Sequence, residues 1–304
     1  MFMYIVYNIS CLNIILGQGI PMNSIELPAP AKINIALDVI GKRPDGYHEV
    51  RMLMQQIKLH DTVVLERSES SIDVSCSNPL VPQGYTNIAY KAAKMLMDSK
   101  GISSGIRIKI DKRIPMAAGL AGGSTDAAAV LKGLNELFSL GLSMEELAQI
   151  GVKAGADVPF CIKGGTMLSE GIGEILTPIS PLQGVYLVVV CPHINVSTQW
   201  VYQQLRLDRI SQRPDFNILI NAISSRDIAE IAGNLINVLE TVTTEKHSII
   251  KEIKEKLVSA GALGSLMSGS GPSVFGIFDS CEKANAACEA ISHEGWDVFL
   301  TETI

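Results

Sequence analysis

The 304-residue chain lacks several patterns that would place it in common protein classes. Its six cysteines include no C-x-x-C pair, and structural zinc sites and disulfide frameworks need closer, patterned spacing. We therefore expect free thiols in a reducing cytoplasm. Runs of basic residues are missing and the net charge is -6, which argues against a protein that binds nucleic acid.

Two common nucleotide-binding fingerprints are also missing. No early strand-like segment runs into G-x-G-x-x-G, which excludes a Rossmann dehydrogenase. The Walker pattern G-x-x-x-x-G-K-[ST] is absent, because no lysine follows the glycines of the central glycine-rich loop. Hydrophobic residues make up 47% and charged residues 18% of the chain, an ordinary globular composition with enough length for two domains.

The first twenty residues carry no charged side chain. They lack the basic start and small-residue cleavage site of a signal peptide. Polar residues interrupt the apolar run that a membrane span needs, namely Asn8, Ser10, Asn13 and Gln18. We interpret residues 1–23 as an extension outside the fold, with Met22 as the functional start. A segment that associates weakly with membranes is the alternative.

A strand with two different faces is predicted from Ala31 onward. Period-two geometry places Lys32 and Asn34 on one face. The opposite face is aliphatic and consists of Ile33, Ile35, Leu37 and Val39.

A turn is predicted at Pro44-Asp45-Gly46, because proline presets φ and glycine accepts a positive φ. This turn delivers Tyr47 and His48 at the start of the next extended segment. Further strands are predicted at 62–66 and 72–76, followed by a helix at 88–97.

The clearest local unit is a strand, a glycine-rich loop and a helix. Isoleucines alternate with polar residues at 106–111, and apolar residues recur at helical spacing after 126. Ser124 or Thr125 is available as the helix N-cap. Loop N–H groups and the positive end of the helix dipole would suit a polyphosphate, but a flexible turn is the alternative. The loop consists of Pro115, Met116, Ala117, Ala118, Gly119, Leu120, Ala121, Gly122, Gly123, Ser124 and Thr125.

A capping box at 143–146 opens another predicted helix, which ends near Gly155. Asp157 then lies just past the helix C-terminus, at the negative end of the dipole, where a carboxylate needs a nearby cation. A carboxylate in such a place can serve as a base toward a substrate hydroxyl. Pro159 ends the helical pattern, and we expect residues 160–168 to be extended.

A second α+β region follows the glycine- and proline-rich segment 171–184. The continuous apolar run 185–190 predicts a central strand. Strands at 263–278 enclose a serine- and glycine-rich turn, 268–273. Helices are predicted at 198–205, 228–239 and 246–260, with one more helix and a strand at 296–301 at the end of the chain.

Three segments in this order resemble the motifs of the GHMP small-molecule kinases: Pro30–Asn34, Pro115–Ala128 and Ser268–Ser273. Within that family the chain is similar to the branch that acts on a cytidine diphosphate conjugate of methylerythritol. The stretches that carry this similarity are Pro28–Asn34, Arg43–Glu49 and Gly155–Phe160. The resemblance covers the chain from about Leu27 to Ile304.

The resemblance implies an α+β, two-domain GHMP kinase fold. Residues 24–170 would form an ATP-binding domain like domain 2 of ribosomal protein S5, and residues 171–304 a ferredoxin-like α/β sandwich that binds substrate. The implied reaction is ATP-dependent phosphorylation of the 2-hydroxyl of that cytidine conjugate in the non-mevalonate route to isoprenoids, with Mg²⁺. The implied enzyme is cytoplasmic and takes a small molecule as its partner, not nucleic acid or a membrane, and a homodimer is compatible with the resemblance.

Residue roles also follow from the resemblance. Asp157 is expected to remove the hydroxyl proton, and Lys32 to steady the developing charge. The loop 115–125 is expected to hold the ATP phosphates. Tyr47 and Tyr202 would stack on the cytosine, and His48 would hydrogen bond to it. The metal ligands stay open among Ser124, Thr125 and Asp126, and the full set expected to bind substrate is Asn34, Tyr47, His48, Tyr202, Ser268, Gly269, Ser270 and Gly271.

Alanine stands at 117, 118 and 121, where glycine is frequent in the family. Alanine donates the same N–H but does not adopt a positive φ cheaply. We therefore expect Gly119, Gly122 and Gly123 to provide the conformational freedom of the loop.

Two other functions remain as alternatives. One is a kinase of the same family that acts on mevalonate, homoserine or a sugar, against which Tyr47 and His48 argue, since those acceptors have no base to stack. The other is a catalytically silent nucleotide-binding protein, which would not need to keep both Lys32 and Asp157.

Overall fold

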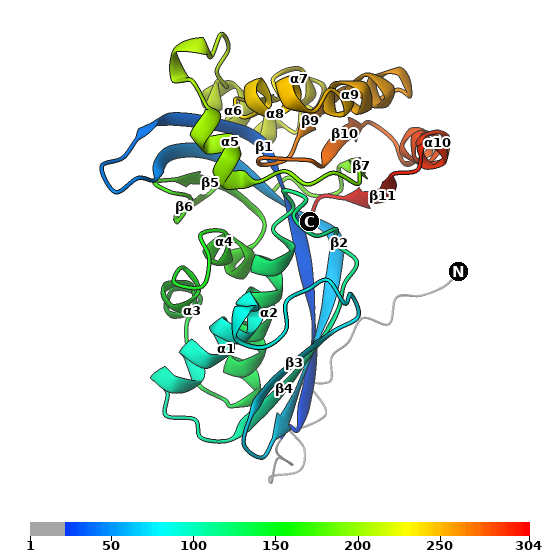
Figure 1. The fold of residues 1–304 in the computed structure, drawn as a ribbon. Coiled ribbons are helices and arrows are strands. Elements are labelled where there is room, and N and C mark those ends of the chain that lie inside the picture. The colour runs from blue at the N-terminus through cyan, green and yellow to red at the C-terminus, as the bar shows by residue number, and fades with distance from the viewer. Residues whose placement is uncertain (1–21) are drawn as a thin grey trace.

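The computed structural model describes residues 22–304, so the predicted extension lies outside the described residues except for Met22 and Asn23. Two sheets, each with its own helices, follow one another along the chain (Figure 1). The helices of the first half occupy the lower part of the view and the second sheet the upper part, while the long blue strands of the first sheet run from one to the other. This mixed arrangement agrees with the predicted α+β class.

Two long antiparallel strands, β1 (Ser24–Lys42) and β2 (His48–Ser68), form the centre of the first sheet. Its order in the described chain is β3-β4-β2-β1-β8, with β3 (Ile72–Cys76), β4 (Gly105–Asp111) and β8 (Ile236–Asn237). β2 changes partner along its length. It pairs with β4 near its end and with β5 (Thr166–Glu170) near its start, and β6 (Ile175–Pro178) pairs with β5.

Four helices lie beside this sheet: α1 (Ile88–Ser99), α2 (Gly122–Leu137), α3 (Met144–Gly151) and α4 (Val158–Lys163). α2 is central, since it contacts β1, β2, α1 and α4. Its apolar residues recur at helical spacing and are buried, as the sequence pattern predicts. The capping box that opens α3 is also confirmed, because Ser143 and Glu146 each bond the other's backbone N–H.

The second sheet has the antiparallel order β11-β7-β10-β9 within the described residues. Its strands are β7 (Tyr186–Cys191), β9 (Gly264–Met267), β10 (Val274–Phe278) and β11 (Asp297–Glu302). β7 is buried and has a neighbour on each side, which confirms the predicted central strand. The helices of this half are α5 (Thr198–Gln204), α6 (Phe216–Ser225), α7 (Ile228–Gly233), α8 (Glu240–Lys246), α9 (Ile249–Ser259) and α10 (Cys281–Ile291), and 3-10 turns occur at Gly84–Thr86, Leu207–Arg209 and Ser292–Glu294.

The two halves are joined by backbone pairing. β8 follows α7 yet pairs in parallel with β1, with Asn237 opposite Leu37. At the chain end, Ile304 donates its N–H to the carbonyl of Gln56, 3.1 Å away. The change from one sheet to the other falls between β6 and β7, so the segment just after residue 171 still pairs in the first sheet. The domain boundary at 170/171 stays a prediction.

Two predicted elements are wrong. The segment 160–168 is not extended throughout, because α4 spans Val158–Lys163 before β5 begins. Pro159 lies in the first turn of α4. N–H groups in the first turn have no acceptor within the helix, so proline costs no hydrogen bond at this position. The predicted helix 228–239 ends at Gly233 and gives way to β8, whose pairing with β1 is a tertiary contact that local periodicity does not encode. The sequence pattern also missed α6.

The simple alternation predicted for β1 is interrupted. The register with β2 shifts between Asn34 and Ala36, which indicates a bulge. Ile33 and Ile35 therefore pack in one core cluster, whereas Leu37 and Val39 pack in the other. Lys32 and Asn34 do share one face, as predicted, because their side chains are hydrogen bonded.

Candidate active site

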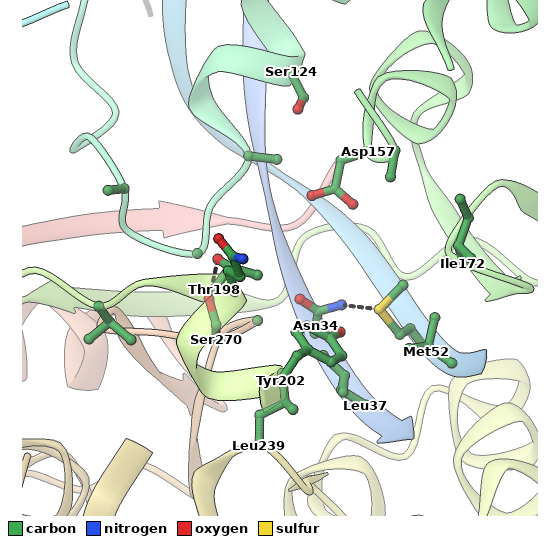
Figure 2. A pocket seen from close by; sticks show the side chains of 18 of the residues that line it. Asn34, Leu37, Met52, Ser124, Asp157, Ile172, Thr198, Tyr202, Leu239 and Ser270 are labelled. Atoms are coloured by element: carbon green, nitrogen blue, oxygen red, sulfur yellow. Dashed lines mark hydrogen bonds between the residues drawn. The ribbon is translucent and has the colours of Figure 1, made fainter. Parts of the chain in front are cut away.

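A cavity of about 910 Å³ lies where the two halves meet. Its wall combines β1, the start of β2, the glycine-rich loop, the Asp157 turn, α5 and the turn after β9, as Figure 2 shows from close by. Most of the predicted site residues line it: Lys32, Asn34, Tyr47, His48, Ala117, Ala118, Gly119, Ala121, Gly122, Gly123, Ser124, Asp157, Tyr202, Gly269 and Ser270. Six predicted residues are not part of its lining: Pro115, Met116, Leu120, Thr125, Ser268 and Gly271.

Lys32 is the charged centre of the cavity. Its Nζ donates to Oδ1 of Asn34 at 2.6 Å and lies 3.9 Å from Oδ2 of Asp157. The Lys32 side chain is 6% exposed, whereas that of Asp157 is 33% exposed. The Asn34 carboxamide is held in turn by Sδ of Met52, 3.4 Å from its Nδ2. The ammonium is thus buried behind a carboxylate that a ligand can still reach.

Asp157 does not occupy the helix end that the sequence suggested. α3 ends at Gly151, and Asp157 is the N-cap residue of α4. In the described part of the chain, the Asp157 carboxylate accepts no hydrogen bond from a backbone N–H of α4. The prediction that Asp157 lies at the negative end of a helix dipole is therefore wrong, because the chain turns after α3 and a new helix begins at Val158. The carboxylate faces Lys32 and the positive end of a short helix.

The helix that follows the glycine-rich loop begins earlier than predicted. Ala121 is its N-cap residue and Gly122 its first helical residue, so the prediction of Ser124 or Thr125 as N-cap is wrong. The Thr125 hydroxyl instead donates to the carbonyl of Pro30, 2.7 Å away, and ties α2 to β1. The N–H groups of residues 122–124 precede the first intrahelical bond, which Thr125 N–H makes to Ala121. All three residues line the cavity, so these donors are available to an anion.

The positions with positive φ also differ from the prediction, which gave the conformational freedom of the loop to its three glycines. Positive φ values occur at Ala117 (50°), Gly119 (76°) and Ala121 (57°), whereas Gly122 and Gly123 are helical. Two alanines thus hold left-handed conformations, which cost about 1 kcal/mol each. A β-carbon on Gly122 would lie 3.0 Å from Nζ of Lys112, a close contact with the end of a long side chain.

Gly119 is where the glycine-rich loop touches the turn after β9. A β-carbon on Gly119 would lie 2.1 Å from the carbonyl oxygen of Ser268. The Ser268 hydroxyl donates to the Gly119 carbonyl at 2.9 Å, and Ser273 N–H donates to the Ala118 carbonyl at 3.2 Å. Lys32 N–H donates to the Leu120 carbonyl at 3.1 Å. Ser268 therefore shapes the site by holding the loop without lining the cavity itself.

Three buried charged side chains lie beneath the loop. Lys112 Nζ contacts Oδ2 of Asp61 and lies 3.0 Å from Oδ2 of Asp126. Asp61 Oδ1 also accepts the N–H groups of Arg113 and Ile114, at 2.6 and 2.8 Å. This cluster connects β2, the entry to the loop and the first turns of α2.

The pKa of Asp126 is raised to about 7, chiefly by burial and also by the neighbouring Asp61, against the opposing effect of Lys112. Oδ1 of Asp126 has no hydrogen-bond partner among the described residues, which agrees with a carboxyl that is partly protonated near neutral pH. Asp126 does not line the cavity, and neither does Thr125. Of the three residues considered as metal ligands, only Ser124 reaches it.

The far end of the cavity is aromatic. The rings of His48 and Tyr202 lie with centroids 5.1 Å apart at an interplanar angle of 38°. Burial, with a smaller effect of Lys42, lowers the pKa of His48, and burial raises the pKa of the Tyr202 hydroxyl. Both groups are therefore uncharged at neutral pH. Tyr47, 61% exposed, extends from the turn beside them.

Several lining residues were missed by the sequence interpretation: Leu37, Gly46, Val50, Met52, Ile88, Ala156, Ile172, Val196, Thr198, Gln199, Gln203 and Leu239. Val50 and Met52 follow His48 at period two, so strand geometry would have placed them on its side. Gln199 lies three residues before Tyr202 and four before Gln203 on α5, so helical spacing would have placed it beside both. For Ile172 and Leu239 the local sequence carries no comparable signal.

Three further observations concern metal clusters, cysteines and helices in the described residues. In residues 22–304, groups of three or more His, Cys, Asp or Glu able to hold a metal ion are not found. The five described cysteines are free, as predicted, and Cys11 lies outside that range. None of the described helices has the length and apolar character to cross a membrane.

The first prediction concerns the contact at Gly119. Gly119→Ala should abolish most activity and lower the melting temperature, because the added β-carbon meets a backbone oxygen that cannot move aside. Gly141→Ala is the matched control, since Gly141 also has a positive φ (66°) and a β-carbon there meets no described atom within 4 Å. The control should cost about 1 kcal/mol of unfolding free energy and keep its turnover. Equal losses of activity in both variants would contradict the proposed contact.

The second prediction concerns pH. The folded-state pKa of Asp126 lies above its ordinary value of 3.8, so the folded protein binds more protons than the unfolded chain between about pH 4 and 7. This group is thus expected to make the protein less stable as pH rises through that window. Urea unfolding at pH 5, 6, 7 and 8 should show a smaller loss of stability with rising pH in Asp126→Asn than in the wild type. Identical pH profiles would show that Asp126 does not titrate there.

Comparisons with known proteins agree with one family. The family model described as GHMP kinases N terminal domain matches residues 87–165, and that described as GHMP kinases C terminal matches residues 219–297. The 4-diphosphocytidyl-2-C-methyl-D-erythritol kinase of Acetivibrio thermocellus is 59% identical over 283 residues, 93% of this chain and 100% of the relative. That of Alkaliphilus metalliredigens is 50% identical, over 89% of this chain and 94% of the relative.

Solved structures give the same result. A crystal structure of 4-(cytidine 5'-diphospho)-2C-methyl-D-erythritol kinase superposes with a TM-score of 0.80 at 33% identity, over 92% of this chain and 99% of that one. A homoserine kinase from Cytophaga hutchinsonii superposes with a TM-score of 0.74 at 19% identity, which shows a shared fold only. The predicted two-domain fold is confirmed, and the chain belongs to the 4-diphosphocytidyl-2-C-methyl-D-erythritol kinase family of the GHMP kinases.

Proposed function

We propose that this enzyme transfers the terminal phosphate of ATP to the 2-hydroxyl of 4-diphosphocytidyl-2-C-methyl-D-erythritol, a step of the non-mevalonate route to isoprenoids. The observation that carries the proposal is the single cavity that joins three groups. These are the Lys32–Asp157 pair, the free N–H groups at the start of α2, and the aromatic end at His48 and Tyr202. A cytoplasmic location and a small-molecule partner belong to the same proposal.

The phosphate end of the cavity holds few charged side chains. Lys32 is the only lysine or arginine among the described residues that line it, and Asp157 the only carboxylate. Phosphate charge must therefore be met largely by fixed N–H donors and the dipole of α2, with Lys32 at the reacting centre. Such preorganised donors stabilise the charge that develops during phosphoryl transfer without moving during the reaction.

Asp157 is proposed as the general base. Its carboxylate is partly exposed to the cavity and faces the buried ammonium of Lys32. A substrate hydroxyl held between them gives its proton to the carboxylate as its oxygen attacks the terminal phosphorus, and the bond to the ADP oxygen breaks. Lys32 is placed to balance the negative charge that grows on the transferred group, and Asn34 holds it in position.

Mg²⁺ also belongs to the proposal. The donor that reaches the cavity, the Ser124 hydroxyl, suits an ion that takes few protein ligands and most of its oxygens from phosphates and water. Ser124 lies on the first turn of α2, beside the N–H groups expected to hold the phosphates. When bound, Mg²⁺ would neutralise phosphate charge that one lysine cannot balance.

The aromatic end supports a cytidine-bearing acceptor. Two uncharged rings, His48 and Tyr202, and the exposed ring of Tyr47 offer flat surfaces to a base. A neutral imidazole can donate one hydrogen bond and accept another, as an edge-on contact with a base requires. Mevalonate and homoserine have no ring for these groups to contact.

The third prediction tests the acceptor. Purified enzyme should phosphorylate the cytidylated methylerythritol and should leave mevalonate and homoserine unchanged in a coupled ADP-release assay. Tyr47→Ala should raise KM for the cytidine substrate by about 5- to 150-fold, the equivalent of about 1–3 kcal/mol of lost stacking, with KM for ATP little changed. Turnover of homoserine alone would replace the proposed acceptor and keep the kinase, and a KM effect confined to ATP would remove Tyr47 from the acceptor site.

The fourth prediction tests the base. Asp157→Asn should lower kcat by about 10²- to 10⁴-fold with nucleotide affinity largely kept, because the amide cannot take the hydroxyl proton. Asp227→Asn is the matched control, since Asp227 is also a helix N-cap but does not line the cavity. That control should turn over at the wild-type rate. Near-wild-type kcat in Asp157→Asn would exclude Asp157 as the base.

A further inference from the structure

We propose that Asn237, Glu240 and Thr243 form a positioning clamp, here the α8 clamp, that holds the turn after β9 against Lys32 and the glycine-rich loop. These three residues lie on β8 and α8 and touch neither reacting group. The inference deepens the proposed function, since it concerns the geometry of the same site.

Both the nitrogen and the oxygen of the Asn237 carboxamide are hydrogen bonded. Nδ2 donates to the carbonyls of Met267 and Gly269, each at 2.8 Å. Oδ1 accepts the N–H of Leu239 at 3.0 Å. The residue is 3% exposed, so water cannot replace these partners easily. One buried side chain thus fixes two carbonyls of the turn and the start of α8.

The other two residues hold the same turn from α8. Oε1 of Glu240 accepts the N–H of Met267 at 2.8 Å, and its Oε2 lies 2.6 Å from Nζ of Lys254. The hydroxyl of Thr243 donates to the carbonyl of Ser270 at 3.2 Å. Four backbone groups between residues 267 and 270 are therefore fixed by side chains of the α8 clamp.

The turn that they hold needs external support. Gly269 and Gly271 have positive φ values of 57° and 86°, and glycine loses more conformational freedom on ordering than any other residue. Ser270 lines the cavity and is hydrogen bonded to Thr198 of α5, 2.8 Å between the hydroxyl oxygens.

A shift of this turn would reach the proposed reacting centre directly. A β-carbon on Gly269 would lie 3.5 Å from Nζ of Lys32, which is ordinary van der Waals contact. The neighbouring Ser268 holds the Gly119 carbonyl of the glycine-rich loop. β8 itself pairs with β1 at Leu37, three residues beyond Asn34. The α8 clamp therefore sets the distance between Lys32 and the phosphate-binding amides.

The fifth prediction is the test of this proposal. Asn237→Asp keeps the shape and the acceptor for Leu239, but it replaces both donors with an oxygen that faces two carbonyls. We expect kcat to fall about 10- to 100-fold, as small misplacements of catalytic groups do, while KM for the acceptor changes less than about threefold. Steady-state kinetics with both substrates varied gives these two numbers separately.

Asn135→Asp is the matched control. The Asn135 carboxamide also donates to one carbonyl and accepts one N–H, both of Leu142 at 2.9 Å, and it does not line the cavity. It should lower the melting temperature without lowering kcat. If Asn237→Asp lowers only the melting temperature and keeps wild-type kcat, Asn237 is merely structural and the proposal is overturned.

A second variant keeps the test decisive if Asn237→Asp does not fold. Thr243→Val preserves shape and removes only the bond to Ser270, and it should lower kcat about two- to fivefold with KM kept, a smaller effect in line with the longer bond. Unchanged kcat in that case overturns the proposal. The kinetics are run with whichever acceptor the wild type phosphorylates, so failure of the proposed acceptor is seen in the wild type and remains separate from failure of the α8 clamp.

Discussion

The architecture of the site depends on one close approach, that of Gly119 to the carbonyl of Ser268. The two residues come from different halves of the molecule, and there is no room for a side chain between them. Because the loops meet there, the amides at the start of α2 face the same space as Lys32 on β1. The bonds from Ser268 to Gly119 and from Ser273 to Ala118 make the contact specific. The two sheets thus share one cavity.

Few charged side chains line the cavity at this contact. The cavity wall has one ammonium and one carboxylate among the described residues, and they face each other. A second group of charges, Asp61, Lys112 and Asp126, is buried below the loop, where it holds backbone and leaves no net positive charge for phosphate. In the proposed reaction, phosphate is therefore recognised by the orientation of N–H groups more than by charged side chains. On that proposal, a loop without the Walker lysine still suits ATP.

Sequence patterns predicted the elements well where local periodicity and turn chemistry decide. β3, β4, the α3 capping box and the paired strands around residues 268–273 follow the predicted places, and Lys32 and Asn34 share a face as expected. The errors lie where tertiary contacts override local preference. Ala117 and Ala121 adopt conformations that alanine avoids, because the surrounding contacts hold the loop in place. Most lining residues were found through the resemblance, whereas Leu239, Ile172 and the α8 clamp depend on contacts distant in sequence.

The position of strain in the glycine-rich loop follows from the same reasoning. The loop has unfavourable positive φ values at Ala117 and Ala121. Its glycines, in contrast, lie at close contacts: Gly119 against Ser268, and Gly122 against Lys112. Glycine at 117 or 121 would relax φ, but it would also widen the set of conformations open to the unbound loop. An alanine in a left-handed conformation leaves the loop fewer alternatives and so keeps the amides preorganised. Rigidity of the loop before α2 thus comes from sterically limited residues, and close packing between the halves comes from glycine.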